Sequence, residues 1–201
     1  LSNDDRDKRL RSSVLIQQEG ENVVIDSGPD FRQQMLRVGV TSLKGLVFTH
    51  EHKDHIAGMD DIRAFNYING SRVDVYASGR VEDALRREFP YVFEDLKYPG
   101  VPEIDLHRIE EEPFKVGSMD WTPIDVLHYR LPVKAFRIGD FTYMTDANHV
   151  PEQSMKKLRG TKILVINALR HETHISHFNL KEALNLIEDI KPERAFLTHI
   201  S

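Results

Sequence analysis

Short apolar runs recur along the chain between more polar stretches. Continuous runs of three or four apolar residues are typical of strands that are buried on both faces. The pattern therefore predicts a set of buried strands spread over most of the sequence. The runs lie at 14–16, 23–25, 45–48, 73–76, 163–166 and 195–197.

Three segments between these runs have apolar residues at helical spacing. They cover 30–39, 80–89 and 179–190. The first ends at Gly39 and the second ends before Pro90, and both residues are common stop signals. Asn179 and Glu182 have the spacing of a capping pair, so the third helix is expected to begin at Asn179.

The stretch 104–145 has the pattern of consecutive strands rather than of helices. Gly117 and the pair Gly139–Asp140 mark the expected turns between them. The fold class expected is therefore α/β with a mixed sheet. Neither an internal repeat nor a Gly/Ser/Pro-rich linker divides the sequence, so residues 1–201 are expected to form a single domain.

Composition and charge exclude some classes of protein and of metal site but do not identify one. Hydrophobic residues make up 40 % and charged residues 29 %, the mixture of a globular protein, and the first residues are too polar for a signal peptide. The net charge of −5 argues against general nucleic-acid binding, although a local basic patch stays open. The absence of cysteine excludes thiolate metal ligands. We expect a protein without a membrane association, and a cytoplasmic location is the default.

Residues that can bind metal ions follow five of the predicted strands. They are Asp26, His50, His128, Asp146 and His199. Strand ends in α/β proteins gather at one edge of a sheet, where loops present their side chains to a common crevice. We therefore expect these residues, which are far apart in sequence, to converge on one site.

The segment His-Glu-His-Lys-Asp-His at 50–55 carries the densest cluster. Alternate residues of an extended segment share a face, so His50 and His52 can bind one ion, while Asp54 and His55 reach a second. A carboxylate can bridge two cations, and Asp146 is the natural bridge. Two ions about 3.5–4 Å apart would hold a shared hydroxide for hydrolysis.

The remaining candidates are weighed against ordinary structural roles. Asp26 is expected to brace the metal loop, Trp121 to pack in the core, and His107 to be an ordinary surface residue. Arg63 and Arg170 are expected to be surface arginines. The roles of His149, His171 and His174 stay open.

Several longer motifs resemble the metallo-β-lactamase superfamily, and within it the branch containing PhnP, a phosphoribosyl cyclic-phosphate phosphodiesterase. They are IDSGPDFRQQ (25–34), THEHKDHIAGMDDIRAFN (49–66), LPVKAFRIGDFTYMTDANHVP (131–151) and LTHIS (197–201). The resemblance implies a four-layer αββα sandwich with two metal ions, zinc or manganese, at one edge. It implies that His50, His52 and His128 hold one ion, that Asp54, His55 and His199 hold the other, and that Asp146 bridges them. His177 matches the histidine that acts on the substrate side.

Members of this branch usually begin with a further strand, a Gly-Thr-Gly-Thr-Ser-type loop and the cysteines of a structural zinc site. They also usually continue beyond the position of Ser201. We therefore expect this sequence to be a fragment of a slightly longer chain that lacks the first strand and the C-terminal end of the fold.

The function expected is hydrolysis of small phosphodiesters, above all cyclic ones, with His177 and Asp54 as the catalytic side chains. Asp54 is favoured as a metal ligand over a free base. The partner expected is a small-molecule substrate, and a homodimer stays open. One alternative is hydrolysis of a lactone, thioester or β-lactam, which a metal-bound hydroxide also performs. Another is a non-hydrolytic metal-binding protein of a cofactor pathway. A redox role is disfavoured because such members typically replace His52 by glutamate.

Overall fold

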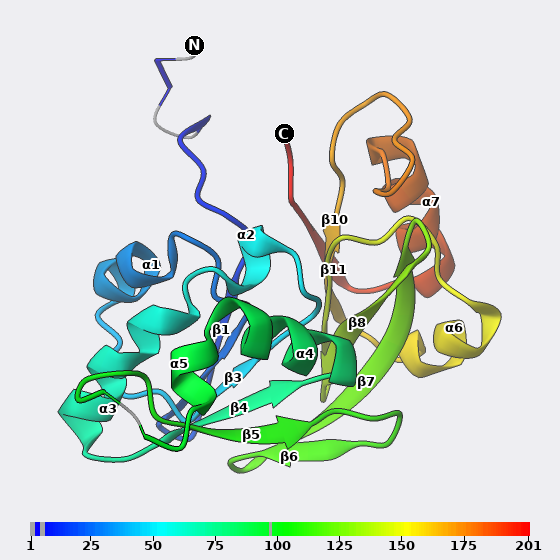
Figure 1. Ribbon diagram of the computed structural model, residues 1–201. Coiled ribbons are helices and arrows are strands. Elements are labelled where there is room, and N and C mark those ends of the chain that lie inside the picture. Colours follow the sequence, from blue (N-terminus) through cyan, green and yellow to red (C-terminus); the bar gives the residue numbers. More distant parts are fainter. Residues whose placement is uncertain (1–2, 5–6, 97) are drawn as a thin grey trace.

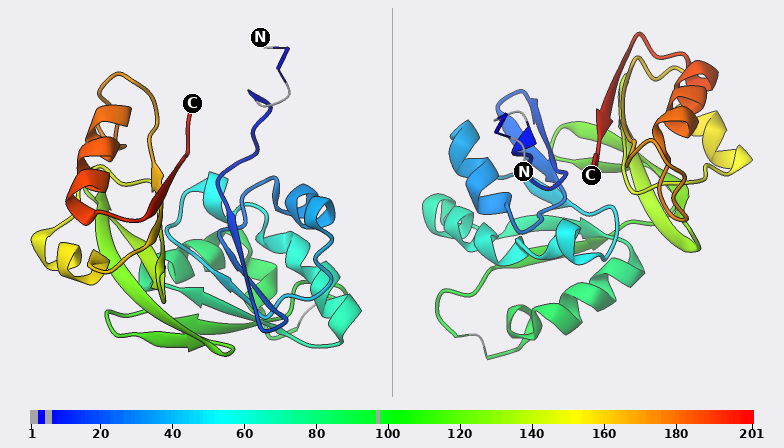
Figure 2. Two further views of the ribbon diagram at one scale, coloured as in Figure 1. Left: turned by 180° about the vertical axis from the view of Figure 1, so that it is seen from behind. Right: turned by 90° about the horizontal axis from the view of Figure 1, so that it is seen from above.

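Two β-sheets lie face to face, and helices cover the outer side of each, so the elements form the four layers αββα (Figures 1 and 2). This computed structural model describes residues 3–4, 7–96 and 98–201. The predicted fold class is confirmed. Among the described residues, every helix is too short or too polar to cross a membrane.

The first sheet has the strand order β1-β2-β3-β4-β5. Its strands pair in parallel from β2 to β5, and β1 joins the edge antiparallel to β2. The strand bounds are β1 Val14–Gln18, β2 Glu21–Ile25, β3 Gly45–Val47, β4 Val73–Ala77 and β5 Ile104–Arg108. The helices on this half are α1 Phe31–Val38, α2 Lys53–Ile56, α3 Arg63–Asn69, α4 Gly79–Glu88, α5 Pro90–Phe93 and a 3-10 turn at Met59–Ile62.

The second sheet has the order β11-β10-β9-β8-β7-β6. The strands β6 to β9 form an antiparallel meander, whereas β9, β10 and β11 run parallel and need helical crossovers. The strand bounds are β6 Phe114–Val116, β7 Met119–His128, β8 Leu131–Ile138, β9 Phe141–Met144, β10 Ile163–Asn167 and β11 Arg194–Thr198. The helices on this half are α6 Glu152–Leu158 and α7 Leu180–Ile190.

Three apolar clusters fill the three interfaces between the four layers. Side chains alternate between the two faces of a strand, so neighbours on one strand enter different clusters. In β3, Leu46 packs under the helices of the first half, whereas Val47 packs between the sheets. In β9, Met144 faces α6 and α7, whereas Tyr143 joins Trp121 between the sheets. Burial on both faces explains why the strands are continuous apolar runs.

The structure confirms the main elements expected from the sequence. Each of the six apolar runs forms a strand, and each of the three periodic segments forms a helix. The capping box between Asn179 and Glu182 is present at the start of α7. The chain crosses from the first sheet to the second between β5 and β6, which the strand pattern of 104–145 alone did not indicate.

Four helices of four to seven residues, α2, α3, α5 and α6, were not predicted from the sequence. Isolated helices of this length are unstable, so tertiary contacts rather than local propensity must hold them. The α2 segment shows how. The Ser27 amide donates to the His55 carbonyl at 2.8 Å, and the Gly58 amide donates to the Ser27 carbonyl at 2.7 Å. The strand-end loop after β2 thereby fixes the loop that carries the histidines.

Candidate metal centre

The ligand-type residues after five strands converge at one edge of the two sheets. Asp26 follows β2, His50 follows β3, His128 ends β7, Asp146 follows β9 and His199 follows β11. The segment that precedes β1 also meets the end of β11 near this edge, where the Ser12 and Thr198 hydroxyls lie 3.3 Å apart. The expected convergence of sequence-distant residues is present in the structure.

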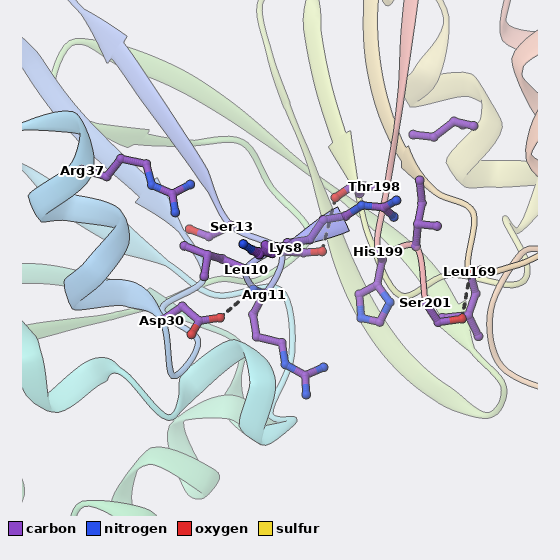
Figure 3. Close-up of a pocket in the computed structure, with 14 residues that line it drawn as sticks. Lys8, Leu10, Arg11, Ser13, Asp30, Arg37, Leu169, Thr198, His199 and Ser201 are labelled. Atoms are coloured by element: carbon purple, nitrogen blue, oxygen red, sulfur yellow. Dashed lines mark hydrogen bonds between the residues drawn. The ribbon is translucent and has the colours of Figure 1, made fainter. Parts of the chain in front are cut away.

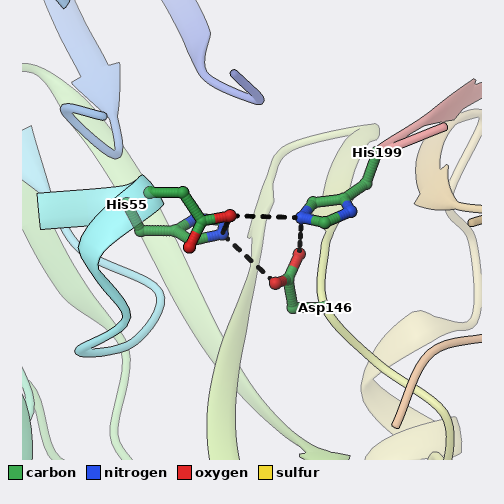
Figure 4. A group of neighbouring side chains, drawn as sticks. His55, Asp146 and His199 are labelled. Atoms are coloured by element: carbon green, nitrogen blue, oxygen red, sulfur yellow. Dashed lines mark hydrogen bonds and ion pairs between the residues drawn. The ribbon is translucent and has the colours of Figure 1, made fainter. Parts of the chain in front are cut away.

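The carboxylate of Asp146 faces both His55 and His199 (Figure 4). Its Oδ2 atom lies 3.2 Å from Nε2 of His55 and 3.5 Å from Nε2 of His50. Its Oδ1 atom lies 3.1 Å from Nε2 of His199. Oδ2 also lies 3.4 Å from Nε2 of His177, which comes from the loop between β10 and α7. Four imidazoles, two from the 50–55 loop and two from later parts of the chain, therefore face one carboxylate.

Three groups of side chains meet at Asp146, and within each group the ligand atoms lie within 4.8 Å of one another. The groups are Asp54 with His55, Asp146 and His199; His50 with His52 and Asp146; and His128 with Asp146 and His177. The first group contains the side chains predicted for one ion, and the second contains two of the three histidines predicted for the other. His128 was predicted to lie beside His50 and His52, but its ring lies nearer to His177. Its ring centroid is 5.0 Å from that of His52 and 4.5 Å from that of His177.

The loop at 50–55 has the geometry expected from its spacing. His52 is extended (φ −66°, ψ 148°) and caps α2, and the Nε2 atom of His50 lies 3.0 Å from Nδ1 of His52. After His52 the chain turns into α2, which brings Asp54 and His55 close to Asp146. The Asp54 Oδ2 atom lies 3.6 Å from Nε2 of both His55 and His199.

Hydrogen bonds from outside this group fix the orientation of several rings. The Asp26 carboxylate accepts from the Thr49 amide and hydroxyl, both at 2.8 Å, and lies 2.8 Å from Nδ1 of His55. The Thr49 hydroxyl in turn lies 3.0 Å from Nδ1 of His50. His128 points Nδ1 at the Ser176 carbonyl at 2.7 Å. These contacts leave Nε2 of each of the three rings facing the site.

Three residues of the site have left-handed backbone conformations. The φ angles are 62° for Asp26, 55° for Asp146 and 54° for His199. A side chain other than glycine is disfavoured there, although Asp and His tolerate it better than most residues. Such conformations cost about 1–3 kcal/mol and gather at functional sites. Each one turns the chain sharply just after a strand, where the side chain must enter the crevice.

The carboxylates and imidazoles shift one another's pKa values. Burial by itself raises the pKa of Asp146, but the neighbouring imidazoles of His177, His199 and His55 hold it well below its usual range. Burial lowers the pKa of His199, but its hydrogen bonds to Asp146 and Asp54 outweigh burial and raise the value to about 9. Burial and the nearby His55 lower the pKa of His50. The site therefore combines negatively charged carboxylates with imidazoles whose pKa values are shifted in opposite directions.

Residues 21–200 match the family model of the beta-lactamase superfamily domain. The chain belongs to the metallo-β-lactamase superfamily. A solved structure of a diphosphatase from the PhnP family shares 37 % of its residues with the chain and superposes with a TM-score of 0.92, covering 100 % of this chain and 76 % of that one. Membership of the superfamily and the likeness to its PhnP branch are therefore as the motifs predicted.

Curated relatives of this superfamily member carry several names. An octanoyltransferase from Porphyromonas gingivalis is 36 % identical over 100 % of the chain, which spans 41 % of that protein. A ribonuclease Z from Methanosarcina acetivorans is 31 % identical over 52 % of the chain and 34 % of its own length. The chain thus spans less than half the length of these two relatives. The short form of human tRNase Z, at 18 % identity and a TM-score of 0.73, shares the fold.

The side chains of this metallo-β-lactamase site fit divalent metal ions. Zinc and manganese ions in proteins are bound by imidazole nitrogens and carboxylate oxygens, and this sequence has no cysteine thiolate to bind them instead. Tetrahedral ligands at Zn–N distances of 2.0–2.1 Å lie about 3.3–3.4 Å apart. The atoms around Asp146 have spacings of 3.1–3.6 Å, which is close to that value. Nε2 of His177 is buried without a hydrogen-bond partner among the described residues, as expected of an atom that faces a ligand.

The other residues weighed in the sequence analysis are not part of the metal centre. His107 is exposed on β5 and pairs with Asp74 at 2.6 Å, and Trp121 is fully buried in the core, as expected for both. His149 and His171 are exposed. Arg63 lies 3.6 Å from Asp60, so it has the surface pairing that was expected.

Two contributors to the site lay outside the sequence predictions. One is Thr49, whose side chain links Asp26 to His50, and the other is Ser176, whose carbonyl orients His128. Thr49 directly precedes the histidine cluster, so its position was a usable signal. Ser176 contributes through its backbone carbonyl, which every residue has, so the sequence offers no signal for this contact.

Replacing Asp26 with asparagine is expected to weaken divalent-metal binding by about 10–100-fold without unfolding the protein. The asparagine side chain can still accept a hydrogen bond from Thr49, but it lacks the negative charge that holds Nδ1 of His55. Competition with a chromophoric chelator measures the affinity. Asp120→Asn, at an exposed position paired with Lys115, is the matched control. Wild-type affinity in the Asp26 variant would show that this brace is dispensable.

Metal binding is expected to release protons near neutral pH. The His199 pKa of about 9 means that its ring is protonated at pH 7.5 without metal, whereas a metal ligand must be neutral. Affinity should therefore rise with pH up to about 9 and fall as the solution is acidified. Calorimetric titration with zinc in buffers of different ionisation enthalpy should show proton release to which His199 contributes about one proton, so His199→Gln should lower the count by about one. His55, whose pKa the carboxylates of Asp26 and Asp146 also raise, should release a proton in both proteins. Heats that are independent of the buffer would contradict this.

Proposed function

We propose that residues 1–201 form one hydrolase domain that uses divalent metal ions to cleave small phosphodiesters, cyclic ones included. The observation that carries this proposal is the position of Asp146, which is shared by three groups of metal-ligand side chains. One carboxylate shared by separate ligand groups is suited to holding two cations side by side. Sites of this kind clamp both the attacking and the leaving oxygen of a phosphoryl group.

Two of the groups that meet at Asp146 support the proposed ligands, and His128 is added from the resemblance, although its ring lies nearer that of His177. His50, His52 and His128 would hold one ion, Asp54, His55 and His199 would hold the other, and Asp146 would contact both. When bound, zinc or manganese ions lower the pKa of water and polarise the phosphoryl oxygens. Asp54 is assigned as a ligand rather than a free base, because its carboxylate is already 3.6 Å from the ring nitrogens of His55 and His199.

His177 is the proposed proton donor to the leaving oxygen. Its ring is nearly buried, and its Nδ1 lies 3.2 Å from both the Ser176 hydroxyl and Nδ1 of His174. Its Nε2 faces Asp146 at 3.4 Å, at the edge of the ligand group. A ring that is oriented through Nδ1 and has no hydrogen-bond partner at Nε2 can carry a proton on Nε2 and donate it to the leaving oxygen.

Phosphorus is favoured over carbon as the reacting centre by one of the similar solved structures. That protein is a PhnP-family diphosphatase, and it is 37 % identical over the whole of this chain. Acyl-group hydrolysis is the second candidate. It is favoured by 36 % identity over the whole chain with the octanoyltransferase of Porphyromonas gingivalis. Because the chain spans 41 % of that protein, its named activity can belong to the remainder.

A substrate screen of the metal-loaded protein tests the proposal. The panel contains cyclic phosphates, linear phosphodiesters, lactones and thioesters, and the chelated protein is the control. We expect the highest kcat/KM on phosphodiesters and loss of that activity with chelator. A higher kcat/KM on thioesters or lactones would establish acyl hydrolysis instead. Stoichiometric metal without turnover of any class would favour a metal carrier.

A further inference from the structure

The metal centre has different surroundings on its two sides. On the His199 side lies an open groove of about 750 Å³, lined by residues 8–13 and Arg37 on one wall and by residues 197–201 on the other (Figure 3). The opposite side is that of His128, because β9, which leads to Asp146, lies between β11 and β7 in the second sheet. The turn between β7 and β8 begins directly after His128, so this turn flanks the metal centre on that side.

This turn differs from the other tight hairpin turns of the protein. Among the described residues, four hairpins have strands joined by two residues, at 19–20, 117–118, 129–130 and 139–140. Three of them hold Gly20, Gly117 or Gly139 at a positive φ, which glycine adopts without strain. The turn after β7 has no glycine and holds Tyr129 at a φ of 58° instead. Such a φ is strained for a residue as bulky as tyrosine.

Burial of the Tyr129 ring does not offset this strain. The residue is 47 % exposed and belongs to none of the three apolar clusters. Its ring lies beside the next side chain, that of Arg130, whose Cζ atom is 5.1 Å from the ring centroid. Strained residues gather at functional sites, so an exposed and strained tyrosine next to His128 indicates a function for its ring.

Hydrogen bonds to neighbouring loops of the metal centre hold the strained turn. The Tyr129 amide donates to Oδ1 of Asn148 at 2.7 Å, and Nδ2 of Asn148 donates to the Ile175 carbonyl at 2.9 Å. Ile175 is exposed and directly precedes Ser176, whose carbonyl orients His128. One amide side chain therefore ties together the backbones of two exposed apolar residues, Tyr129 and Ile175, at one rim of the site.

This rim lies on the side of the proposed proton donor. The ring centroid of His128 is 4.5 Å from that of His177. Consecutive Cα atoms are about 3.8 Å apart, so the Tyr129 side chain begins next to this pair of rings. An organic group attached to the leaving oxygen would therefore meet the rim formed by Tyr129 and Ile175.

We propose that Tyr129 determines substrate specificity by stacking on a planar aromatic ring that the leaving group of the phosphodiester carries. The inference rests on the proposed function for the place of the diester and for His177 as the proton donor. Stacked aromatic rings bind about two to ten times more tightly than their buried area alone provides. A tyrosine also loses little conformational freedom on binding, because it has two χ angles. The substrate class is a diester of a small alcohol that bears a planar ring.

Two symmetric diesters separate stacking from ordinary apolar contact. Dibenzyl phosphate carries planar rings, whereas bis(cyclohexylmethyl) phosphate carries saturated rings of similar size and larger apolar surface. Isothermal titration calorimetry with the metal-loaded protein should show about fivefold tighter binding of the dibenzyl ester. Burial of apolar surface alone would favour the cyclohexyl ester, so the order of the two affinities identifies stacking. Phosphorus NMR of the same mixtures measures cleavage separately.

Variants of Tyr129 separate the role of its ring from that of its backbone. Tyr129→Gly should lose the preference for the dibenzyl ester, and its Tm should be unchanged or higher, because glycine adopts the positive φ freely. Tyr129→Phe keeps a ring and should keep the preference. The matched control is Tyr67→Ala, since Tyr67 is 93 % exposed on α3 in the other half of the fold, and its loss should leave the preference unchanged.

Equal binding of the two esters, tighter binding of the cyclohexyl ester, or binding of neither would overturn the proposal. An unchanged preference in Tyr129→Gly would overturn it too, as would a Tm several degrees lower, because the fold would then require the ring. Adenosine 5′-phosphate methyl ester identifies the source of the ring when stacking is observed. Binding tighter than that of dibenzyl phosphate supports a nucleoside, and weaker binding supports a simple aryl alcohol.

The outcome for Tyr129 is separate from the outcome for the proposed function. A preference for the dibenzyl ester that Tyr129→Gly removes, in a protein that cleaves neither ester, would refute the hydrolase proposal and leave the stacking role standing. Cleavage of both esters without a difference in binding would do the reverse.

Discussion

Replacing Asp146 with asparagine is expected to lower phosphodiester turnover by about 10³-fold or more and to leave the fold intact. Asparagine has the shape of aspartate and tolerates the left-handed backbone at this position, where φ is 55°. The amide has no negative charge and offers one oxygen as a ligand. It therefore cannot bring together the three groups of side chains that meet at Asp146.

Turnover and metal content should be measured on the same samples of the Asp146→Asn variant. Metal content should fall below the wild-type ratio, and the circular dichroism spectrum should be unchanged. Asp140→Asn is the matched control, because Asp140 lies in the exposed turn before β9 and pairs with Lys162. Wild-type turnover at wild-type metal content in the Asp146 variant would remove the bridging role.

Replacing His177 with alanine is expected to slow hydrolysis of substrates with poor leaving groups by about 10²–10⁴-fold. Activated aryl esters should be affected much less. An alkoxide leaves as a strong base and needs a proton, whereas a nitrophenolate is stable without one. The nearly buried His177 ring, with Nε2 3.4 Å from Asp146, is placed to supply that proton.

The structure also offers a rival role for His177, because its ring groups with His128 and Asp146 as a potential metal-ligand set. As a ligand, its loss would slow both classes of substrate together and weaken metal binding. The deciding measurement is the rate of the variant against leaving-group pKa at verified metal content. A steeper dependence than in the wild type supports the acid, and an unchanged slope rejects it. His107→Ala, at an exposed position on β5, is the control.

The long-range plan of this fold was readable from the sequence because both faces of most strands are buried. Runs such as 163–166 have no competing interpretation once flanking turns are considered, and β10 forms there. The short helices were missed because their stability lies elsewhere. In α2 the backbone of Ser27 holds His55 and Gly58, a contact between two loops that no local pattern encodes.

The site was predictable to the extent that its side chains have a distinctive chemistry. The spacing of His50, His52, Asp54 and His55 identified one wall, and the strand ends identified the others. The sequence could not indicate that the ring of His128 lies close to both His52 and His177, because that depends on the Ser176 carbonyl. It also could not show that Arg9, Arg11 and Arg37 line one groove with residues 197–201, since these arginines resemble ordinary surface residues until the fold brings them together.

The central claim is that Asp146 joins two metal ions held by separate ligand groups. Anomalous diffraction from crystals of the manganese- or zinc-loaded protein tests it most directly, because the peaks locate each ion against the side chains. We predict two separate peaks, one beside His50 and His52 and the other beside Asp54, His55 and His199, with the Asp146 carboxylate contacting both. A single fully occupied peak, or two peaks of which only one touches Asp146, would contradict this account.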